Sequence, residues 1–300
     1  MSCLNLCALP YTAPEPPAEL FRHVERESGH SDTAAFKEGL DNRDVFFAKR
    51  KCVICGSRNR ILLERCHIVA RSDCHVWTFL RNIGWIPEGA REAPGHEPRN
   101  GLTMCPNHNR SFERWQFFIR FRPDIQKYIF IHYDSYAESL ELAQFHGKAI
   151  ALDPKDKHSP LPLLFLTHEY MVRGRNFHQP SPIPEPTNTW QDWMVNYDVV
   201  NEGDEGSFTF NRSGPPRRNS PIYQSANLQG FDTDASPSGS QNGIMPPTPD
   251  LVAELMAYQL TMPSWKAWQT ESMSWEGTAE ENIKQYVEKV GVEEPEGLNG

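Results

Sequence analysis

The middle of the chain holds three short strings whose residue types suit the hydrolysis of a phosphate ester. They are Cys66-His67-Ile68, Asn100-Gly101-Leu102 and Cys105-Pro106-Asn107-His108-Asn109. A histidine can take a proton from water near neutral pH, because its unperturbed pKa is about 6.5. An amide oxygen is a hard ligand of the kind Mg²⁺ prefers. The set therefore predicts a general base and a metal ligand on either side of a phosphodiester, where a cation offsets the developing charge.

Each of these residues has a predicted role and a plainer alternative. His67 is expected at the end of a strand as the base, and the alternative is a half-buried structural histidine. Asn109 is expected on the first helical turn as a ligand of the catalytic cation, with Glu113 one turn later on the same face as a further carboxylate ligand. Asn100 is expected to hold the loop and the His67 backbone through side-chain hydrogen bonds. The alternatives are a surface asparagine at position 109 and an ordinary turn asparagine before glycine at position 100.

A second cluster has the spacing of a structural zinc site. It consists of a Cys-x2-Cys pair, Cys52 and Cys55, and a Cys-x2-His pair, Cys105 and His108. Such a set suits tetrahedral zinc, and without an export signal it favours metal binding over disulfides. Since Asn109 lies about 100° further round the helix than its neighbour, one turn can serve zinc on one side and catalysis on the other. The alternative is a set of buried, unpaired cysteines beside an exposed histidine.

Charge divides the chain unevenly. The net charge is -9 overall, but residues 43–122 carry 15 Lys and Arg against 7 Asp and Glu. A basic core with acidic flanks suits a nucleic-acid partner, with DNA favoured over RNA. Four arginines are expected to contact phosphates without reading sequence, namely Arg65, Arg71, Arg110 and Arg114. The alternative is ordinary solvated arginine.

Composition predicts one globular domain with flexible flanks. We expect a flexible segment over residues 1–30, the domain over 31–178, a disordered Pro- and Ser-rich linker over 179–249, and short helices over 250–300. The helices could dock on the core or bind a protein partner. No stretch approaches the roughly 18 apolar residues of a membrane span, and the first residues lack a basic signal region. We therefore expect no membrane association, no secretion, and a place in the nucleus or cytoplasm.

The ordered strings resemble the HNH (ββα-metal, or His-Me finger) nuclease superfamily, and most closely the HNH domain of predicted fungal proteins. The matches are Arg43-Asp44, Cys52 to Gly56, Cys66-His67-Ile68, Asn100-Gly101-Leu102, Ser111-Phe112-Glu113 and Gly147-Lys148-Ala149-Ile150. The resemblance implies an α+β fold with a ββα-metal core, added strands and helices, and a long disordered tail. It also implies the base role for His67, the bracing role for Asn100, and Mg²⁺ or Mn²⁺ as the catalytic cation.

Two positions depart from the family pattern. Asn109 stands where the last histidine is usual, as in the HNH domain of RNA-guided CRISPR nucleases. Cys66 stands where many active members have a metal-binding aspartate, and a thiolate is a soft ligand that suits Mg²⁺ poorly. Either Asn109, Glu113 and water hold the ion, or a softer metal is used, or catalysis is weak or lost. The leading hypothesis is therefore an endonuclease, and the alternative is a catalytically silent, zinc-stabilised module that binds nucleic acid or a protein.

Overall fold

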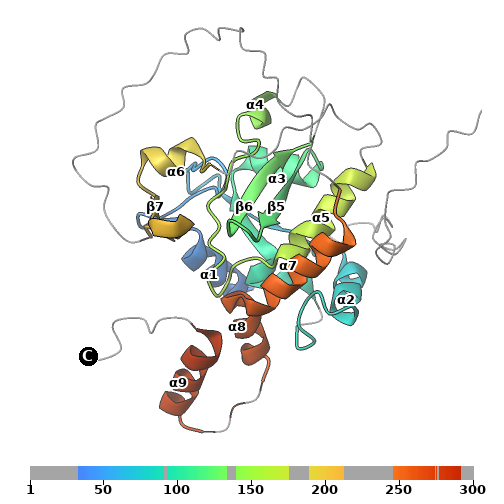
Figure 1. Cartoon of the computed structure of the whole chain (residues 1–300), viewed down its shortest axis with the longest axis vertical. Helices are drawn as coiled ribbons and strands as arrows, with labels where there is room; N and C mark the ends of the chain where they lie inside the picture. Colours follow the sequence, from blue (N-terminus) through green and yellow to red (C-terminus); the bar gives the residue numbers. More distant parts are fainter. Residues whose placement is uncertain are drawn as a thin grey trace, which may run out of the picture.

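The computed structural model describes residues 33–90, 93–133, 140–175, 189–212, 246–273, 275 and 277–291. Short strands lie at its centre and helices surround them (Figure 1). Among the described residues the strands pair into four two-stranded antiparallel sheets, so the fold is α+β as predicted. The predicted flexible segment over residues 1–30 lies outside the described residues.

The unit that carries the predicted site residues consists of two strands and a helix: β3 (Glu64–His67), β4 (Gly101–Met104) and α3 (Pro106–Glu113). The two strands are antiparallel and place His67 directly opposite Gly101. Pro106 opens α3 in its first turn, where a missing N–H leaves no helical hydrogen bond unmade. The helix then contacts both strands. The sequence predicts strands at Cys66-His67-Ile68 and Gly101-Leu102 and a helix from Pro106, and these three elements are confirmed.

Helix α1 (Ala34–Arg43) covers β4. It begins after Thr33, whose hydroxyl oxygen accepts a hydrogen bond from the Phe36 N–H at 3.4 Å. The cap predicted at Ser31-Asp32 lies outside the described residues. A Cβ atom on Gly101 would meet the Phe36 and Leu40 side chains at 2.7 Å, so only glycine lets the helix approach the strand this closely.

A buried ion pair fixes the end of α1 to the same strand. The Arg43 Nε donates to Asp44 Oδ1 at 2.7 Å, and both side chains are almost fully buried. Arg43 also donates to the Gly101 carbonyl, while Asp44 Oδ2 accepts the Thr103 N–H. Removing one partner of such a pair typically costs about 3–5 kcal/mol, because the other charge remains buried alone. The small hairpin of β1 (Val45–Phe46) and β2 (Lys49–Arg50) follows this anchor.

The main core lies behind this unit. It is built from the hairpin of β5 (Phe117–Arg122) and β6 (Lys127–His132), covered by α5 (Pro162–Arg175). Helix α5 is buried on all sides from its first residue to Val172, because β5 and a C-terminal helix enclose it. The apolar runs at 117–119 and 128–131 predict strands and the stretch at 163–173 predicts a helix, and all three are confirmed. A run at 149–152 also predicts a strand, but it is reduced to two isolated bridges at Ala149, preceded by the short helix α4 (Leu140–Ala143).

The connection between β3 and β4 differs from the irregular loop that its glycines and prolines predict. It contains the helix α2 (Cys74–Asn82) and the 3-10 turns η2 (Pro94–His96) and η3 (Pro98–Asn100). Val76, Trp77 and Leu80 lie on one face of α2 and are buried in the core. Burial of this face outweighs the helix-breaking composition of the flanks.

The predicted disordered linker also differs in part. Residues 189–212 fold into α6 (Asp192–Asn196), β7 (Val200–Glu202), the turn η5 (Asp204–Gly206) and β8 (Phe208–Phe210). Trp190 packs edge-on against Phe208, and both are buried. These aromatic anchors order a stretch whose overall composition is polar. The remainder of the predicted linker, apart from residues 246–249, lies outside the described residues.

Three helices follow: α7 (Pro249–Thr261), α8 (Pro263–Glu271) and α9 (Ala279–Val290). Helix α7 lies along α5 (Figure 1), and the buried Gln259 side chain accepts the Leu163 N–H and donates to the Trp85 carbonyl. Helix α8 packs Trp268 against Trp77 of α2. The docking arrangement considered for these helices is thus observed for α7 and α8, whereas α9 packs on α8. Among the described helices, none is long and apolar enough to cross a membrane.

Candidate active site and metal centre

Four metal-ligand side chains meet at the start of α3. The Cys52 and Cys55 thiols come from a tight turn, and Cys105 and His108 come from the first turn of the helix, so that all four ligand atoms lie within 4.8 Å of one another. The Cys55 and Cys105 sulfurs are 3.8 Å apart. Zinc–sulfur bonds of about 2.3 Å at a tetrahedral angle place two sulfurs about 3.8 Å apart. The cluster can therefore hold a metal ion such as zinc.

The turn that carries the first two cysteines requires a glycine. The Gly56 N–H donates to the Cys52 carbonyl at 2.9 Å, and the Gly56 φ is +71°, a left-handed value. A Cβ at this position would lie 2.4 Å from the Trp193 ring of α6, whose indole N–H donates to the Ile54 carbonyl. Helix α6 therefore closes over the metal turn from outside.

The electrostatics of the cluster favour the thiolate that a metal needs. Burial raises the pKa of the Cys52 thiol, whereas hydrogen bonds from Cys52 and Cys55 hold the pKa of Cys105 well below its usual range. Burial opposes protonation of His108, but its contact with Cys105 at 3.0 Å raises its pKa to about 9. The geometry thus favours a negatively charged Cys105 thiolate with a positive charge beside it. A bound metal cation can supply that positive charge in place of the proton on His108.

Asn109 faces away from the cluster, as the helical geometry predicts. Its Nδ2 donates to Glu64 Oε2 at 2.7 Å across the gap between α3 and β3. Its Oδ1 is buried and accepts no hydrogen bond from the described residues. One turn of helix therefore presents His108 to the sulfur cluster and a vacant amide oxygen to the other side.

A cavity of 350 Å³ opens on that other side. It lies between β3, the loop after it, α3 and α5. Six of the predicted site residues line it: Arg65, Cys66, His67, Arg71, Asn109 and Glu113. The predicted base and the predicted oxygen ligand thus lie at one cavity, although they are 42 positions apart in the sequence.

The His67 ring is held by an aromatic partner that the sequence did not indicate. Phe36 of α1 stacks on it with ring centroids 4.3 Å apart and planes inclined by 4°. This contact fixes the plane of the imidazole, and the pairing of β3 with β4 fixes its backbone. Phe36 lies in α1, outside the strings that carry the site residues, so no local spacing pointed to it.

Asn100 holds the backbone that follows His67. Its Oδ1 accepts the Val69 N–H at 2.9 Å, while its Nδ2 donates to the Val69 carbonyl at 2.9 Å and to the Pro94 carbonyl at 3.2 Å. Its own carbonyl accepts the Ile68 N–H at 2.8 Å. The side chain is fully buried, and these contacts agree with the predicted bracing role.

Comparison with known proteins agrees with this arrangement. Residues 52–120 match the family model of HNH endonucleases. This part of the chain is an HNH domain. The match begins at Cys52 of the metal cluster and spans β3, β4 and α3. No curated protein and no solved structure matches the chain.

The Cys66 thiol and the Glu113 carboxylate of the HNH domain are poorly suited to act as metal ligands. Burial, followed by the nearby Glu113 and Glu64 carboxylates, raises the pKa of the Cys66 thiol, so this group stays protonated. Glu113 is exposed at the last position of α3. In the described part of the chain, the sulfur cluster is the one place where three or more Cys, His, Asp or Glu ligands converge. A second cation would therefore depend largely on Asn109, water and the substrate phosphate.

The four predicted phosphate-binding arginines differ in their surroundings. Arg65 is held by Asp41 of α1 through two carboxylate contacts at 2.8 and 2.9 Å, an ion pair that a phosphate would have to replace. Arg71 lines the cavity beside Gly95. Arg110 on α3 and Arg114, which caps the end of that helix, are exposed but do not line the cavity. Arg65 and Arg71 are thus the two predicted arginines that lie at the cavity.

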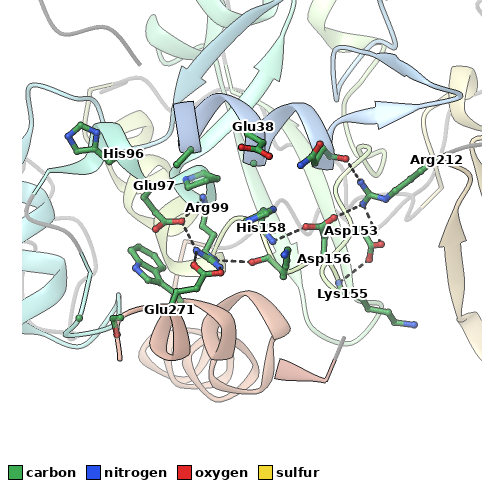
Figure 2. A pocket seen from close by; sticks show the side chains of 18 residues that line it. Glu38, His96, Glu97, Arg99, Asp153, Lys155, Asp156, His158, Arg212 and Glu271 are labelled. Carbon is green, nitrogen blue, oxygen red and sulfur yellow. Dashed lines mark hydrogen bonds and ion pairs between the residues drawn. The ribbon is translucent and has the colours of Figure 1, made fainter. Parts of the chain in front are cut away.

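A second cavity, of 870 Å³, is lined by residues 96–99, just before Asn100, and by residues of α1 and α8 (Figure 2). At its centre the buried Arg99 donates to Glu97 at 2.9 Å and to both carboxylate oxygens of Glu271 at 3.1 Å. Burial and then the positive charge of Arg99 lower the pKa of the neighbouring His158 to about 4. The positive charge of Arg99 is therefore neutralised by Glu97 and Glu271, and the Glu271 contact ties α8 to the residue before Asn100. The sequence did not indicate this link, because its partners are 172 positions apart.

Proposed function

We propose that the chain is a metal-dependent endonuclease that hydrolyses phosphodiester bonds in nucleic acid, with His67 as the general base. The observation that carries this proposal is the cavity that His67 and Asn109 share, inside the segment that matches HNH endonucleases. HNH nuclease domains act on nucleic acid, and residues 43–122 carry the excess of positive charge that a polyanionic substrate requires.

The base works from a fixed position. His67 accepts a proton from a water molecule, whose oxygen forms a new bond to phosphorus while the bond to the leaving oxygen breaks. The leaving oxygen takes a proton from solvent, which yields a phosphate monoester and a hydroxyl group. The Phe36 ring holds the imidazole plane, and Asn100 holds the backbone after it, so little motion is needed to align the water.

The residues around Asn109 fit a hard cation. Its Oδ1 accepts no hydrogen bond from the described residues, and Glu64 fixes the other end of the amide. Such a partner orients a ligand in the same way as the carboxylates behind metal-bound histidines. A Mg²⁺ or Mn²⁺ ion bound here supplies Lewis-acid stabilisation of the phosphate and the leaving oxygen. Glu113 is the further carboxylate that we assign to it, and Cys66 remains the soft ligand available if a softer metal is used.

We assign structural zinc to Cys52, Cys55, Cys105 and His108. The 3.8 Å separation between sulfurs supports tetrahedral zinc, and the absence of disulfides among the described cysteines keeps the thiols available as ligands. A zinc ion held by these four side chains would join the turn before β3 to the start of α3. It would therefore help to set the spacing between the strand that carries His67 and the helix that carries Asn109.

Nicking of supercoiled plasmid tests the nuclease proposal. Purified protein with Mg²⁺ or Mn²⁺ should convert the plasmid to the open circle, and EDTA should stop the reaction. The His67→Ala variant should lose about 10²–10⁴-fold in rate, the usual contribution of a general base. His75→Ala, on α2 and outside the cavity lining, is the matched control and should keep the wild-type rate. Equal nicking by wild type and His67→Ala would refute the assignment of the base.

A silent module that binds nucleic acid is the second candidate. The protonated Cys66 thiol at the cavity and the small number of converging hard ligands favour it. It predicts no nicking with any divalent metal, together with retained DNA binding that weakens as salt rises. The logarithm of the binding constant should then fall with the logarithm of salt concentration, with a slope of about -0.9 for each phosphate contacted.

A further inference from the structure

The loop between the metal turn and β3 carries two apolar side chains into solvent. Ile61 is 92% exposed and Leu62 is 51% exposed, which makes Ile61 the most exposed large hydrophobic side chain among the described residues. A single exposed aliphatic residue is common on protein surfaces. Two adjacent exposed aliphatic side chains at the tip of a short loop indicate a binding surface when the loop is held in a fixed conformation. The charges around the tip then indicate which kind of partner binds there.

The loop is held at both ends and across its tip. At its start, the Cys52 N–H donates to the Ser57 carbonyl at 2.9 Å, directly beside the metal cluster. At its tip, the Asn59 carbonyl accepts the N–H groups of Leu62 at 2.9 Å and Leu63 at 3.2 Å. Leu63 then packs against the core and leads into β3. The apolar tip is therefore presented by a hydrogen-bonded turn, which limits the entropy lost when it binds.

The charges around the tip select an anionic partner. Arg58 and Arg60 lie just before the apolar pair in the sequence, and both are exposed. An apolar tip beside two exposed arginines matches stacked bases between phosphates better than it matches an apolar protein surface.

We propose that Ile61 and Leu62 form a wedge that inserts between stacked base pairs of duplex DNA, with Arg58 and Arg60 on the adjacent phosphates. This inference rests on the proposed function and names its substrate as duplex DNA. Proteins use Ile and Leu side chains in this way to unstack one base step and kink the duplex. Leu62 lies five residues before His67, the last residue of β3, which is a separation of at most about 17 Å at about 3.3 Å per residue. The wedge therefore kinks the duplex within about five base pairs of the bond that is cut.

The fluorescence of 2-aminopurine in a short duplex, measured with EDTA to prevent cleavage, tests the wedge directly. Binding of the wild type should raise the fluorescence, because the probe base loses a stacking neighbour. The double variant Ile61→Ser, Leu62→Ser should lose that rise while keeping most of the salt-sensitive binding. It should nick duplex plasmid at least about tenfold more slowly and cut single-stranded DNA at the wild-type rate. Val195→Ser, which removes an aliphatic side chain that is 57% exposed on α6, should behave as wild type.

The outcomes separate the wedge from the nuclease. His67→Ala should keep the full fluorescence rise, and a rise in a protein that never nicks would support the wedge while refuting the nuclease. Nicking by wild type without any fluorescence rise would overturn the wedge and leave the nuclease standing. An equal rise with the double variant would also overturn it. Loss of self-association in the double variant, with unchanged DNA behaviour, would assign the apolar tip to a protein contact instead.

Discussion

Substitutions of Asn100 give the sharpest test of how the HNH domain holds the backbone beside His67, the proposed base. The side chain is fully buried and satisfies three backbone groups, the N–H and carbonyl of Val69 and the carbonyl of Pro94. In Asn100→Ala all three groups lose their partner. Each unsatisfied buried group costs about 1–3 kcal/mol, and water entering the small space recovers part of this. We therefore expect Asn100→Ala to lower the free energy of unfolding by about 3–5 kcal/mol.

Asn100→Asp should be worse than the alanine variant near neutral pH, although aspartate has nearly the same shape. One carboxylate oxygen can still accept the Val69 N–H, but the other faces two carbonyl oxygens where the amide donated. Burial and these carbonyls favour the protonated acid, so the folded pKa of the new aspartate lies above the unfolded value of about 3.9. The folded state then binds more protons, and the stability of this variant falls as pH rises above about 4.

Urea unfolding followed by tryptophan fluorescence measures both effects, with plasmid nicking measured on the same samples. Asn196→Ala, at an exposed position of α6, is the control and should change stability by less than about 0.5 kcal/mol. The bracing argument fails if Asn100→Ala loses less than about 1 kcal/mol. It also fails if Asn100→Asp matches or exceeds the alanine variant in stability at neutral pH, since the amide would then not donate to the two carbonyls.

Two further predictions concern contacts that hold the domain together. Cys105→Ser should abolish bound zinc and lower the melting temperature. Cys74→Ser changes an exposed cysteine outside the cluster and should keep one zinc per chain by metal analysis. Unchanged zinc content in Cys105→Ser would refute the ligand set. Glu271→Gln leaves the buried Arg99 with one carboxylate partner and should lower stability by about 1 kcal/mol, a value reduced for solvent screening of a side chain that is 41% exposed. Its nicking rate should fall as well, and an unchanged rate would show that α8 does not act on the Asn100 loop.

The parts of the fold that follow from local patterns could be predicted from the sequence. Pro106 begins a helix because its fixed φ and missing N–H suit the first turn, and the strings before it have the apolar and β-branched content of strands. The Cys-x2-Cys spacing places two ligands on one side of a turn, and the Cys-x2-His spacing places two on one side of a helix. The metal cluster could therefore also be predicted from the sequence. In each case the information lies within a few residues of the feature.

Composition gave the wrong secondary structure where the burial of a few side chains stabilises a segment that is otherwise polar or rich in glycine and proline. The glycines and prolines between β3 and β4 predict an irregular loop, but α2 forms because its apolar face is buried against α8 and the core. Conversely, residues 61–63 predict a strand, yet Ile61 and Leu62 form an exposed turn and Leu63 packs against the core, since no neighbouring strand offers them a partner in the described part of the chain. Propensity describes a segment alone, whereas burial depends on what the rest of the chain places beside it.

The HNH domain cannot be understood from its matched segment alone. Two short strands and one helix bury little apolar surface, and an isolated two-stranded hairpin is marginal in water. Here β4 is secured by Asp44 and Arg43 from before the match, and the proposed base, His67, is stacked on Phe36 of α1. The cavity is lined by His168 and Met171 of α5, which lie beyond the other end of the match. The residues proposed to carry the chemistry lie within residues 52–120, but the contacts that position them come from both sides of that segment.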